Sequence, residues 1–361
     1  ILDRDALWQA CVEALVDCEA PDEVQKRLAV QPLLVEALAR GDAEIKQRFA
    51  AKPTRTKAIR ERSLLVDGII QLCLQSAQMA LGATQKSVSI LATGGYGRRE
   101  MFFHSDIDVM FLVPEKKAEK AEAVTSFILY VLWDSGLKVG HSVRTVQEAM
   151  DESLSDMTIR TNLLESRFIA GKRSHANDFF ARYQAEIVQG REAEFTEAKM
   201  QEWRQRHNKL GTSRYVLEPN IKEGKGGLRD LHMLMWLARY HFSAIKMSDL
   251  LALGRISKEE LREFRRARTF LHVVRLHLHD FAGRAEERLN FDAQREISQR
   301  LNYRGNTPNQ SVERFMKRYF LAIKTVGRLT RNFFFMLEED QKRSWNLAFP
   351  VLSRLPEGFK Y

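Results

Sequence analysis

The chain has 361 residues, of which 44% are hydrophobic and 29% charged, and its formal net charge is +10. This length allows two or three domains with separate cores and excludes a single small module. The composition excludes a disordered chain. The sequence has no run of about 18 apolar residues, which excludes a membrane-embedded protein. The excess of cations fits phosphate-bearing ligands, nucleic acid or an acidic protein surface, and equally a solvated basic surface.

Residues 1–82 are predicted to form helices that proline interrupts. The interruptions lie near Ala20-Pro21 and Lys52-Pro53, because proline cannot continue the hydrogen bonds of a helix. After the second interruption, apolar residues recur at helical spacing. They are Leu64, Leu65, Ile69, Leu72 and Leu74.

Three cysteines, Cys11, Cys18 and Cys73, lie on these helical patterns without the spacing of metal ligands. An odd number of cysteines without a disulfide framework is typical of a reducing compartment, where a buried thiol acts as a small apolar side chain. The N-terminus has neither a secretion signal nor an initiator Met. We therefore expect a cytoplasmic protein, and a fragment or a processed chain.

The pattern changes at Gly82, after which short apolar runs replace the helical stripes. The runs span residues 87–93, 106–113 and 136–145, and a helical stretch at 118–133 separates the last two. Two strands, a helix and a third strand predict a small sheet, for which a mixed order of strands is open.

From residue 146 onward the chain is predicted to be almost entirely helical. Two sets of apolar residues recur at three- and four-residue spacing: Leu261, Phe264, Ala267, Leu271, Val274 and Leu278, and Val312, Phe315, Met316, Tyr319, Ile323, Val326 and Leu329. One basic, glycine-rich stretch at 217–234 interrupts the helices and leads into an amphipathic helix.

Two aspartates stand at the start of the second predicted strand. Side chains alternate along a strand, so Asp106 and Asp108 point the same way while Ile107 and Val109 point into the core. Like charges side by side are costly unless a cation lies between them, and hard cations such as Mg²⁺ take oxygen ligands. The pair therefore predicts a site for Mg²⁺, with Mn²⁺ as the alternative.

A glycine pair precedes the aspartates. Gly94 and Gly95 follow the first predicted strand, where glycine allows a tight turn whose amides face a phosphate. Arg98 and Arg99 add cationic donors nearby. A strand, a glycine turn and an Asp-x-Asp strand are typical of a metal and triphosphate site. The alternative is an ordinary turn followed by polar residues at a strand start.

The stretch G-G-Y-G-R-x-E followed by S-D-I-D is similar to the nucleotidyltransferase superfamily that includes DNA polymerase beta. In detail it resembles the PII uridylyltransferase family, the bifunctional uridylyltransferase and uridylyl-removing enzymes. Further stretches carry this closer resemblance, which spans about residues 60–340. They are VGHSVRT (139–145), EPNIKEGKGGLRDLH (218–232), FDAQREI (291–297) and VERFMKRYF (312–320).

The resemblance implies an α+β fold in which a small mixed-sheet nucleotidyltransferase domain is flanked by helices and followed by an all-helical domain. The expected parts are an N-terminal helical region (1–82), the nucleotidyltransferase domain (83–170), the helical domain (171–345) and a truncated linker (346–361). Members of the family carry a His-Asp hydrolase domain and two ACT domains further on. We therefore expect the transferase half alone, without the uridylyl-removing activity.

The implied reaction transfers UMP from UTP to a tyrosine of the PII nitrogen-regulatory signal protein, with release of pyrophosphate. By the family pattern, Asp106 and Asp108 hold the metal. Gly94 and Gly95 face the triphosphate, and Arg98 and Ser105 are further nucleotide-binding candidates.

The superfamily usually supplies a third carboxylate from a later strand, but the corresponding stretch GHSVRT offers none. Glu165 and Asp156 are the candidates for this acid or for the general base, and Glu165 is preferred. For each of them an ordinary acid on a helix surface is the favoured alternative, because a base must first reach the site.

The loop at 217–234 lacks the G-x-x-x-x-G-K-[ST] spacing of a P-loop. It is either a turn before a helix or, as the resemblance implies, a segment that closes over the nucleotide. In the second case the candidates for nucleotide binding are Asn220, Lys222, Arg229 and Asp230.

Two other patterns have structural explanations. His272, His277, His279 and Asp280 lie on one predicted helix without a second cluster, which favours core or surface histidines over a metal-dependent phosphohydrolase. The run Phe333 to Phe335 is expected to pack against neighbouring helices, with an exposed remainder that truncation would explain.

Two alternatives to PII modification stay open. The chain could be a nucleotidyltransferase acting on an RNA end or a small molecule, or a non-catalytic nucleotide-binding regulator. Nucleic acid is not favoured because basic and aromatic residues do not interleave, and a regulator would be expected to lack one of the two aspartates. No membrane partner is expected.

Overall fold

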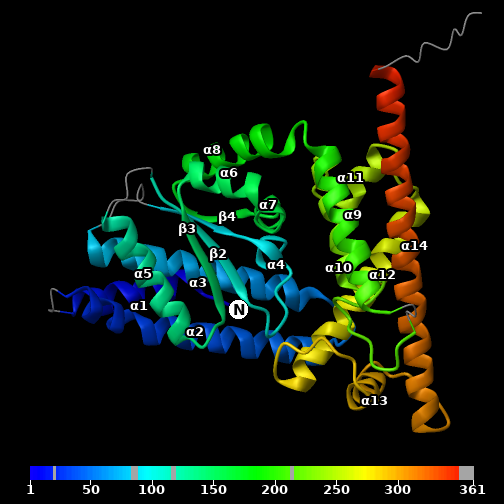
Figure 1. Ribbon diagram of the computed structural model, residues 1–361. Coiled ribbons are helices and arrows are strands. Elements are labelled where there is room, and N and C mark those ends of the chain that lie inside the picture. The colour runs from blue at the N-terminus through cyan, green and yellow to red at the C-terminus, as the bar shows by residue number, and fades with distance from the viewer. Residues whose placement is uncertain (19–21, 83–87, 115–118, 212–214, 349–361) are drawn as a thin grey trace, which may run out of the picture.

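The computed structural model describes residues 1–18, 22–82, 88–114, 119–211 and 215–348. Its helices surround one small sheet, which confirms the expected α+β class (Figure 1). The predicted linker at 346–361 lies almost entirely outside the described residues, and the predicted domain ranges stay a prediction.

Three helices form the N-terminal region, as the proline positions predicted. They are α1 (Arg4–Val16), α2 (Glu23–Ala51) and α3 (Lys57–Leu81). The side chains of Asp3 and Asp22 cap the first two by accepting backbone N–H bonds, and Gly82 ends the third in a left-handed conformation. Cys11 and Cys73 are buried free thiols, but Leu64, which was assigned to the apolar stripe, is 47% exposed.

The sheet has four strands in the order β3-β2-β1-β4. Its strands are β1 (Ser89–Ala92), β2 (Ile107–Leu112), β3 (Val139–Arg144) and β4 (Arg167–Gly171). β1 pairs antiparallel with β2 and β4, while β2 and β3 are parallel, so the sheet is mixed. The last strand was missed, because the region after residue 146 was expected to be helical.

Helices between and after the strands cover the sheet. They are α4 (Gly94–Gly97), α5 (Glu119–Asp134), α6 (Val146–Ser155), α7 (Met157–Leu164) and α8 (Arg173–Arg182). A π-helical turn (Tyr183–Val188) and α9 (Glu192–Lys209) follow, and α9 lies beside α10 rather than on the sheet. In Figure 1 the helices α6 to α8 lie on the opposite side of the sheet from α1 to α3.

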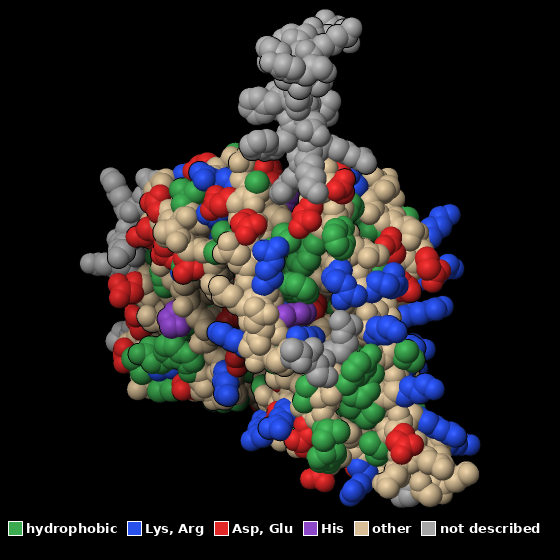
Figure 2. All heavy atoms as spheres, turned by 45° about the vertical axis from the view of Figure 1, so that its right-hand side comes forward, with side chains coloured by type: hydrophobic (Ala, Val, Ile, Leu, Met, Phe, Trp, Pro, Cys, Tyr) green, Lys and Arg blue, Asp and Glu red, His purple; other side chains and the backbone are tan. Residues whose placement is uncertain are grey.

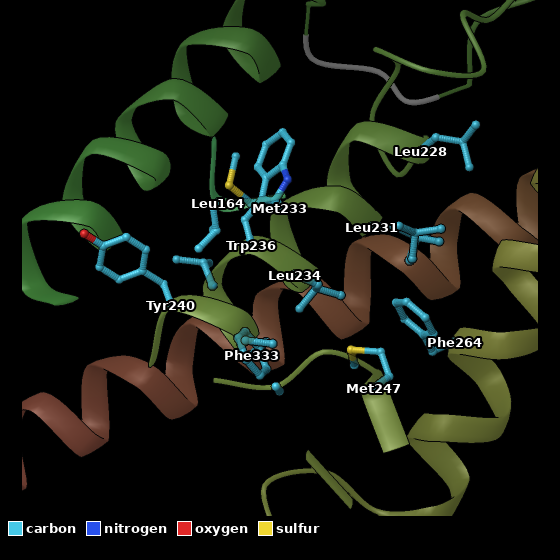
Figure 3. Packing of buried hydrophobic residues seen from close by; sticks show 14 of the residues in the cluster. Leu164, Leu228, Leu231, Met233, Leu234, Trp236, Tyr240, Met247, Phe264 and Phe333 are labelled. Carbon is cyan, nitrogen blue, oxygen red and sulfur yellow. The ribbon is translucent and has the colours of Figure 1, made fainter. Parts of the chain in front are cut away.

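The remaining helices form a separate bundle beside the sheet, in which α14 is much the longest (Figure 1). They are α10 (Leu228–Phe242), α11 (Met247–Ala252), α12 (Lys258–Ala282), α13 (Phe291–Arg300) and α14 (Pro308–Ala348). The apolar residues of α10 pack between α7, α12 and α14, as Leu164, Leu234, Phe264 and Phe333 show in Figure 3.

Two hydrophobic cores meet at the sheet, one on each face. On β2, Ile107, Val109 and Phe111 belong to the core of α1, α2, α3 and α5, whereas Met110 and Leu112 belong to the core of the helical bundle. Both faces of the strand are therefore buried, and the sheet is a wall shared by the two cores.

Among the described residues, α3 is the one helix long and apolar enough to cross a membrane, and 67% of that apolar window is buried inside the protein. Its apolar residues belong to the core beneath the sheet, so packing within the chain accounts for their hydrophobicity. Figure 2 shows the face that includes the helical bundle, where Lys and Arg side chains project along the right-hand edge and hydrophobic patches lie inward of it.

Candidate active site

A pocket of about 520 Å³ lies between the sheet and the helical bundle. The sheet side contributes α4 and the start of β2, and the other side contributes α9, α10 and the loops before α10 and α13. Nine predicted residues line it: Gly94, Gly95, Arg98, Ser105, Asp106, Asp108, Glu165, Lys222 and Arg229. Asn220, Asp230 and Asp156 are not among its lining residues.

The two aspartates reach this pocket from the start of β2. Asp108 lies on the strand and is partly buried, whereas Asp106 directly precedes the strand and is exposed. Ile107 between them is fully buried in the core beneath the sheet. Burial, and then the charge of Asp106, raise the pKa of the Asp108 carboxyl, as expected for two like charges held close together.

Ionic partners distinguish these aspartates from the other acids of the pocket. Glu100, Glu165, Glu202, Glu223 and Glu287 line it and each bonds to a basic side chain. Within the described residues, the carboxylates of Asp106 and Asp108 have no hydrogen bond or ion pair. Their repulsion is therefore not compensated by a protein cation in contact with them.

The donor set fits a cation that shares its ligands with a substrate. No group of three or more His, Cys, Asp or Glu side chains within the described ranges is placed to hold a metal. Two carboxylates together with substrate phosphates are nevertheless a common arrangement for Mg²⁺. β3 adds no acid here, because Gly140 lies opposite Asp108 in the register.

Steric crowding explains the glycine at the start of α4. Gly94 has φ +52°, and a Cβ there would lie 2.7 Å from Oδ1 of Asn162 and 3.3 Å from Oδ2 of Asp108. At Gly97 a Cβ would lie 2.2 Å from the backbone oxygen of Glu165. The turn can therefore lie against β2 and α7 only without side chains at these positions.

A buried network fixes the other side of this turn. The hydroxyl of Tyr96 donates to Asp67 on α3 at 2.7 Å, and Arg167 on β4 binds the same carboxylate through two nitrogens at 2.8 and 2.9 Å. Burial, and then Asp67, raise the pKa of the tyrosine well above its usual value. The glycine turn is thus anchored to the N-terminal helices and to the edge strand.

Glu100 connects the turn to the helical bundle, and sequence reasoning missed it. This side chain is 6% exposed and accepts from Arg98 at 3.0 Å, from His232 on α10 at 2.9 Å and from Arg268 on α12 at 2.8 Å. Although burial opposes ionisation, Arg98 and His232 hold the pKa of its carboxyl well below the usual value. A charged acid among basic partners would have been the only signal, and two of the three partners, His232 and Arg268, lie more than 130 residues away.

Glu165 and Asp156 have different environments. Glu165 lies in the pocket wall, is 5% exposed and pairs with Arg98. Burial raises the pKa of its carboxyl, although Arg98 opposes the rise. Asp156 is the exposed N-cap of α7, where it accepts from the amides of Thr158 at 2.6 Å and Ile159 at 2.9 Å.

The loop before α10 combines structural residues with residues that reach the pocket. Asn220 accepts from the amides of Lys222 and Glu223 at 2.9 and 2.7 Å and so shapes the turn. Asp230 is fully buried and bonds to Arg206 and to the amide of Gly226. Both side chains hold the loop rather than line the pocket.

Two side chains of this region face the pocket. The ammonium of Lys222 has no hydrogen bond or ion pair in the described structure, and burial, followed by the nearby Arg275, lowers its pKa. Arg229 pairs with Glu223 at 2.9 Å and lies 5.6 Å from the ring centre of Trp236.

Trp236 was not predicted and forms part of the same wall. Its side chain is 5% exposed. The ammonium of Lys199, which pairs with Glu202, lies 5.4 Å from the centre of its ring. An aromatic ring between two cations is favourable because of the ring quadrupole. Its position on α10, four residues after His232, does not by itself predict that the side chain reaches the pocket.

The histidines of α12 are core residues. His272, His277 and His279 are each at most 5% exposed. His277 bonds to the backbone oxygen of Pro53, and His279 lies near Glu287 at 3.8 Å. Their burial agrees with the favoured interpretation of core residues.

Comparisons show which known proteins this chain is similar to. Residues 194–334 match the GlnD PII-uridylyltransferase family. Three similar curated proteins are each called a bifunctional uridylyltransferase/uridylyl-removing enzyme. That of Rhodospirillum rubrum is 43% identical over 98% of this chain and 38% of its own length. That of Novosphingobium aromaticivorans is 43% identical over 96% and 38%, and that of Azospirillum brasilense 44% identical over 95% and 37%.

The chain thus spans somewhat more than a third of the length of these relatives. The similarity covers the strands, the glycine turn and the aspartates as well as the helical bundle, because it extends over nearly all of the chain. The resemblance seen in the motifs is confirmed. The chain therefore carries a GlnD PII-uridylyltransferase domain and is homologous, over nearly its whole length, to part of the bifunctional uridylyltransferase/uridylyl-removing enzymes.

Proposed function

We propose that this chain transfers UMP from UTP to a tyrosine of the PII signal protein and releases pyrophosphate. One observation carries the proposal. Asp106 and Asp108, which have no ionic partners among the described residues, share a pocket with the Gly94–Gly97 turn. The names of the relatives supply the uridylyl group and the PII acceptor.

The triphosphate is proposed to lie between the glycine turn and the loop before α10. The first turn of a helix leaves amides without partners inside the helix, and the absence of side chains at Gly94 and Gly95 lets phosphate approach them. Lys222 on the opposite wall brings an ammonium that contacts no described acid. Arg98 is held by Glu100 and Glu165, and it supports the turn with its charge.

In the proposed reaction the tyrosine oxygen attacks the α-phosphorus of UTP in line with the leaving group. The bond between oxygen and the α-phosphorus forms as the bond to the bridging oxygen of pyrophosphate breaks. The phenolic proton leaves the tyrosine, and pyrophosphate carries away the released negative charge. The residues of the pocket orient both reactants, which is the main protein contribution to reactions of this type.

Mg²⁺ held by Asp106 and Asp108, with Mn²⁺ as the alternative, would supply charge stabilisation at the α-phosphate and at the leaving group. The two aspartates fit such an ion because no described protein cation contacts either carboxylate, and the nearby charges of Lys222 and Arg98 only partly offset the rise in the pKa of Asp108. The partial exposure of the pair leaves room for phosphate oxygens as further ligands.

Glu165 remains the candidate to accept the phenolic proton. It lines the pocket, and burial raises the pKa of its carboxyl, which favours a base that can hold a proton. Its ion pair with Arg98 would have to open for this role. Replacing it by Gln and following the dependence of transfer on pH separates a base from a residue that only holds Arg98.

The test is a transfer assay with the purified chain, Mg²⁺, each labelled nucleoside triphosphate in turn and PII protein. We expect label on PII from UTP alone. Asp106→Asn and Asp108→Asn should each lower transfer at least about 100-fold, since metal stabilisation contributes several kcal/mol to such reactions. Asp156→Asn is the matched control, because it removes an exposed acid outside the pocket and keeps the cap.

Transfer that survives both substitutions in the aspartate pair would contradict the proposal. Label on RNA ends or small acceptors, but not on PII, would favour the alternative acceptor instead. Binding of UTP without any transfer would favour a nucleotide-binding regulator.

A reducing cytoplasm as the place of action is part of the same proposal and agrees with the buried free thiols of Cys11 and Cys73.

A further inference from the structure

The strand β3 forms one edge of the sheet, and its outer side is open. In the described structure it pairs on one side only, with β2, and no other described strand follows it in the sheet. Gly140, His141 and Val143 are exposed. An open edge presents unpaired backbone groups, which proteins usually cover or protect with charge, proline or a bulge.

The backbone groups that point outward can be assigned from the ladder. Lys138 accepts from the amide of Ile107 at 2.8 Å, and Arg144 accepts from the amide of Val113 at 2.9 Å. Alternate residues of a strand bond to opposite sides, so the even-numbered residues of β3 face β2. The N–H and C=O groups of Val139, His141 and Val143 therefore point away from the sheet.

This edge is continuous with the candidate active site. Gly140 lies opposite Asp108 in the parallel register, and a Cβ at Gly140 would lie only 2.5 Å from Oδ1 of Asp108. Because Gly140 has no side chain, β3 places no side chain against Asp108 at this position of the register. Gly140 lies near the same end of the sheet as Asp106.

Aromatic side chains flank the edge on the other face of the sheet. Trp133 packs on His141 with ring centres 5.6 Å apart, and Tyr130 packs on Trp133 at the same distance. Tyr130 and Trp133 are both more than 40% exposed. Such side chains offer apolar contact area beside the unpaired backbone, as in sites where an extended peptide adds to a sheet.

We propose that an extended segment of the acceptor protein pairs with the outer edge of β3 and carries its tyrosine over Gly140 toward Asp106 and Asp108. The inference rests on the proposed transfer reaction. Neighbouring strands lie about 4.8 Å apart, so an added strand would lie about 10 Å from β2. On the face of the sheet where Asp108 lies, a tyrosine side chain reaches further than a serine or threonine side chain does.

Substitution of Val143 tests the backbone contact. Val143→Pro removes one outward N–H and leaves the ladder to β2 intact, because proline is tolerated on an edge whose N–H faces solvent. We expect the KM for PII to rise about tenfold or more, since a lost hydrogen bond and a steric block each weaken strand addition. The kcat at saturating PII and the KM for UTP should change less than about twofold.

The matched control is Val143→Ala, which keeps the N–H, shortens the exposed side chain and should change the KM for PII by less than about threefold. His141→Pro gives a second test in case Val143→Pro does not fold. Amide hydrogen exchange gives a third: adding PII should slow exchange at His141 and Val143, while Ser142 is already protected by β2.

The possible outcomes separate this inference from the proposed function. An unchanged KM for PII in folded proline variants that still transfer UMP would overturn the inference alone. An absence of transfer by the unaltered chain would overturn the proposed function. A concentration-dependent dimer that the proline variants abolish would instead assign the edge to a second copy of the chain, and would also overturn the inference.

Discussion

Gly94 shows how backbone conformation and available space constrain one residue of the site. Its φ of +52° favours glycine, and a Cβ would contact Asn162 and approach Asp108. The spacing of glycine and aspartate predicted a turn close to a ligand. It could not predict Asn162, because that residue reaches the turn from α7.

Gly94→Ala is expected to lower UMP transfer far more than it lowers stability. The left-handed conformation costs about 1 kcal/mol for a residue with a side chain, and the new methyl group must also displace Asn162 or Asp108. Gly136→Ala is the matched control, since Gly136 has φ +73° and nothing within 4 Å of its added Cβ. Urea unfolding and the transfer assay should show similar stability losses, with activity lost in Gly94→Ala alone.

Equal activity in the two alanine variants would show that the turn tolerates displacement of its neighbours.

Glu100 illustrates the limit of sequence reasoning at this scale. Its role depends on His232 and Arg268, which come from two helices far along the chain. Periodicity predicts which residues of those helices are buried, but not which buried polar groups meet.

Acid should destabilise the protein through the histidines around Glu100. Burial lowers the pKa of His232 and of His272 to about 3, whereas histidine in an unfolded chain has a pKa near 6.5. Between these values the unfolded chain binds more protons, so stability is complete above about pH 6.5 and falls as the pH decreases. Each histidine contributes a slope of up to about 1.4 kcal/mol per pH unit.

Urea unfolding at pH 5, 6 and 7 measures this slope. His272→Gln should make it shallower, since one of the protonation sites is removed. His141→Gln is the control, because it removes an exposed histidine of β3. If His272→Gln kept the full slope, the acid sensitivity would have to arise elsewhere in the chain.

At the scale of elements, α7 connects the site to the cap at Asp156. Two amides of its first turn donate to that side chain, and Glu165 follows the helix at its other end. Sequence reasoning treated both acids as candidates for the same role because their positions on the helix could not be compared with the pocket. The structure places Glu165 in the pocket wall and Asp156 at the opposite, exposed end.

Asp156→Ala is expected to lower the free energy of unfolding by about 1 kcal/mol, because the amides of Thr158 and Ile159 lose their acceptor. Asp156→Asn keeps an acceptor and should restore most of the stability. Thermal unfolding compares the two, and both should retain transfer. Loss of transfer in the stable Asn variant would make Asp156 a participant in the reaction.

The strands were predicted with uneven success for a physical reason. Apolar runs predicted β1, β2 and β3 because each lies between clear changes of pattern. β4 has five residues, and its sequence RFIAG has too few alternating positions to differ from a short helical segment. Pairing with β1, rather than local preference, makes this segment a strand.

At the scale of the whole molecule, the two cores share the sheet. The predicted ranges 1–82, 83–170 and 171–345 follow changes in sequence pattern, whereas the cores follow the two faces of β1 and β2. The apolar runs of those strands were visible in the sequence. Which helices cover each face was not, because that depends on contacts between distant segments.

Residues 83–170 produced alone should therefore fail to fold cooperatively, because both faces of the sheet would lose their covering helices. The complete chain should unfold with coincident transitions of far-ultraviolet circular dichroism and of tryptophan emission. Urea titration of both proteins measures this. A cooperative transition of the isolated segment would show that the strands and their own helices suffice.

Trp236 has an optical consequence. Its indole lies in the pocket wall between the charges of Lys199 and Arg229. An indole's excited state is polarised by nearby charge, so an anionic nucleotide that neutralises these cations should alter the wavelength at which Trp236 fluoresces. Trp236 is thus an intrinsic fluorescent reporter beside the pocket. Its emission should follow nucleotide binding in real time, before any acceptor is added.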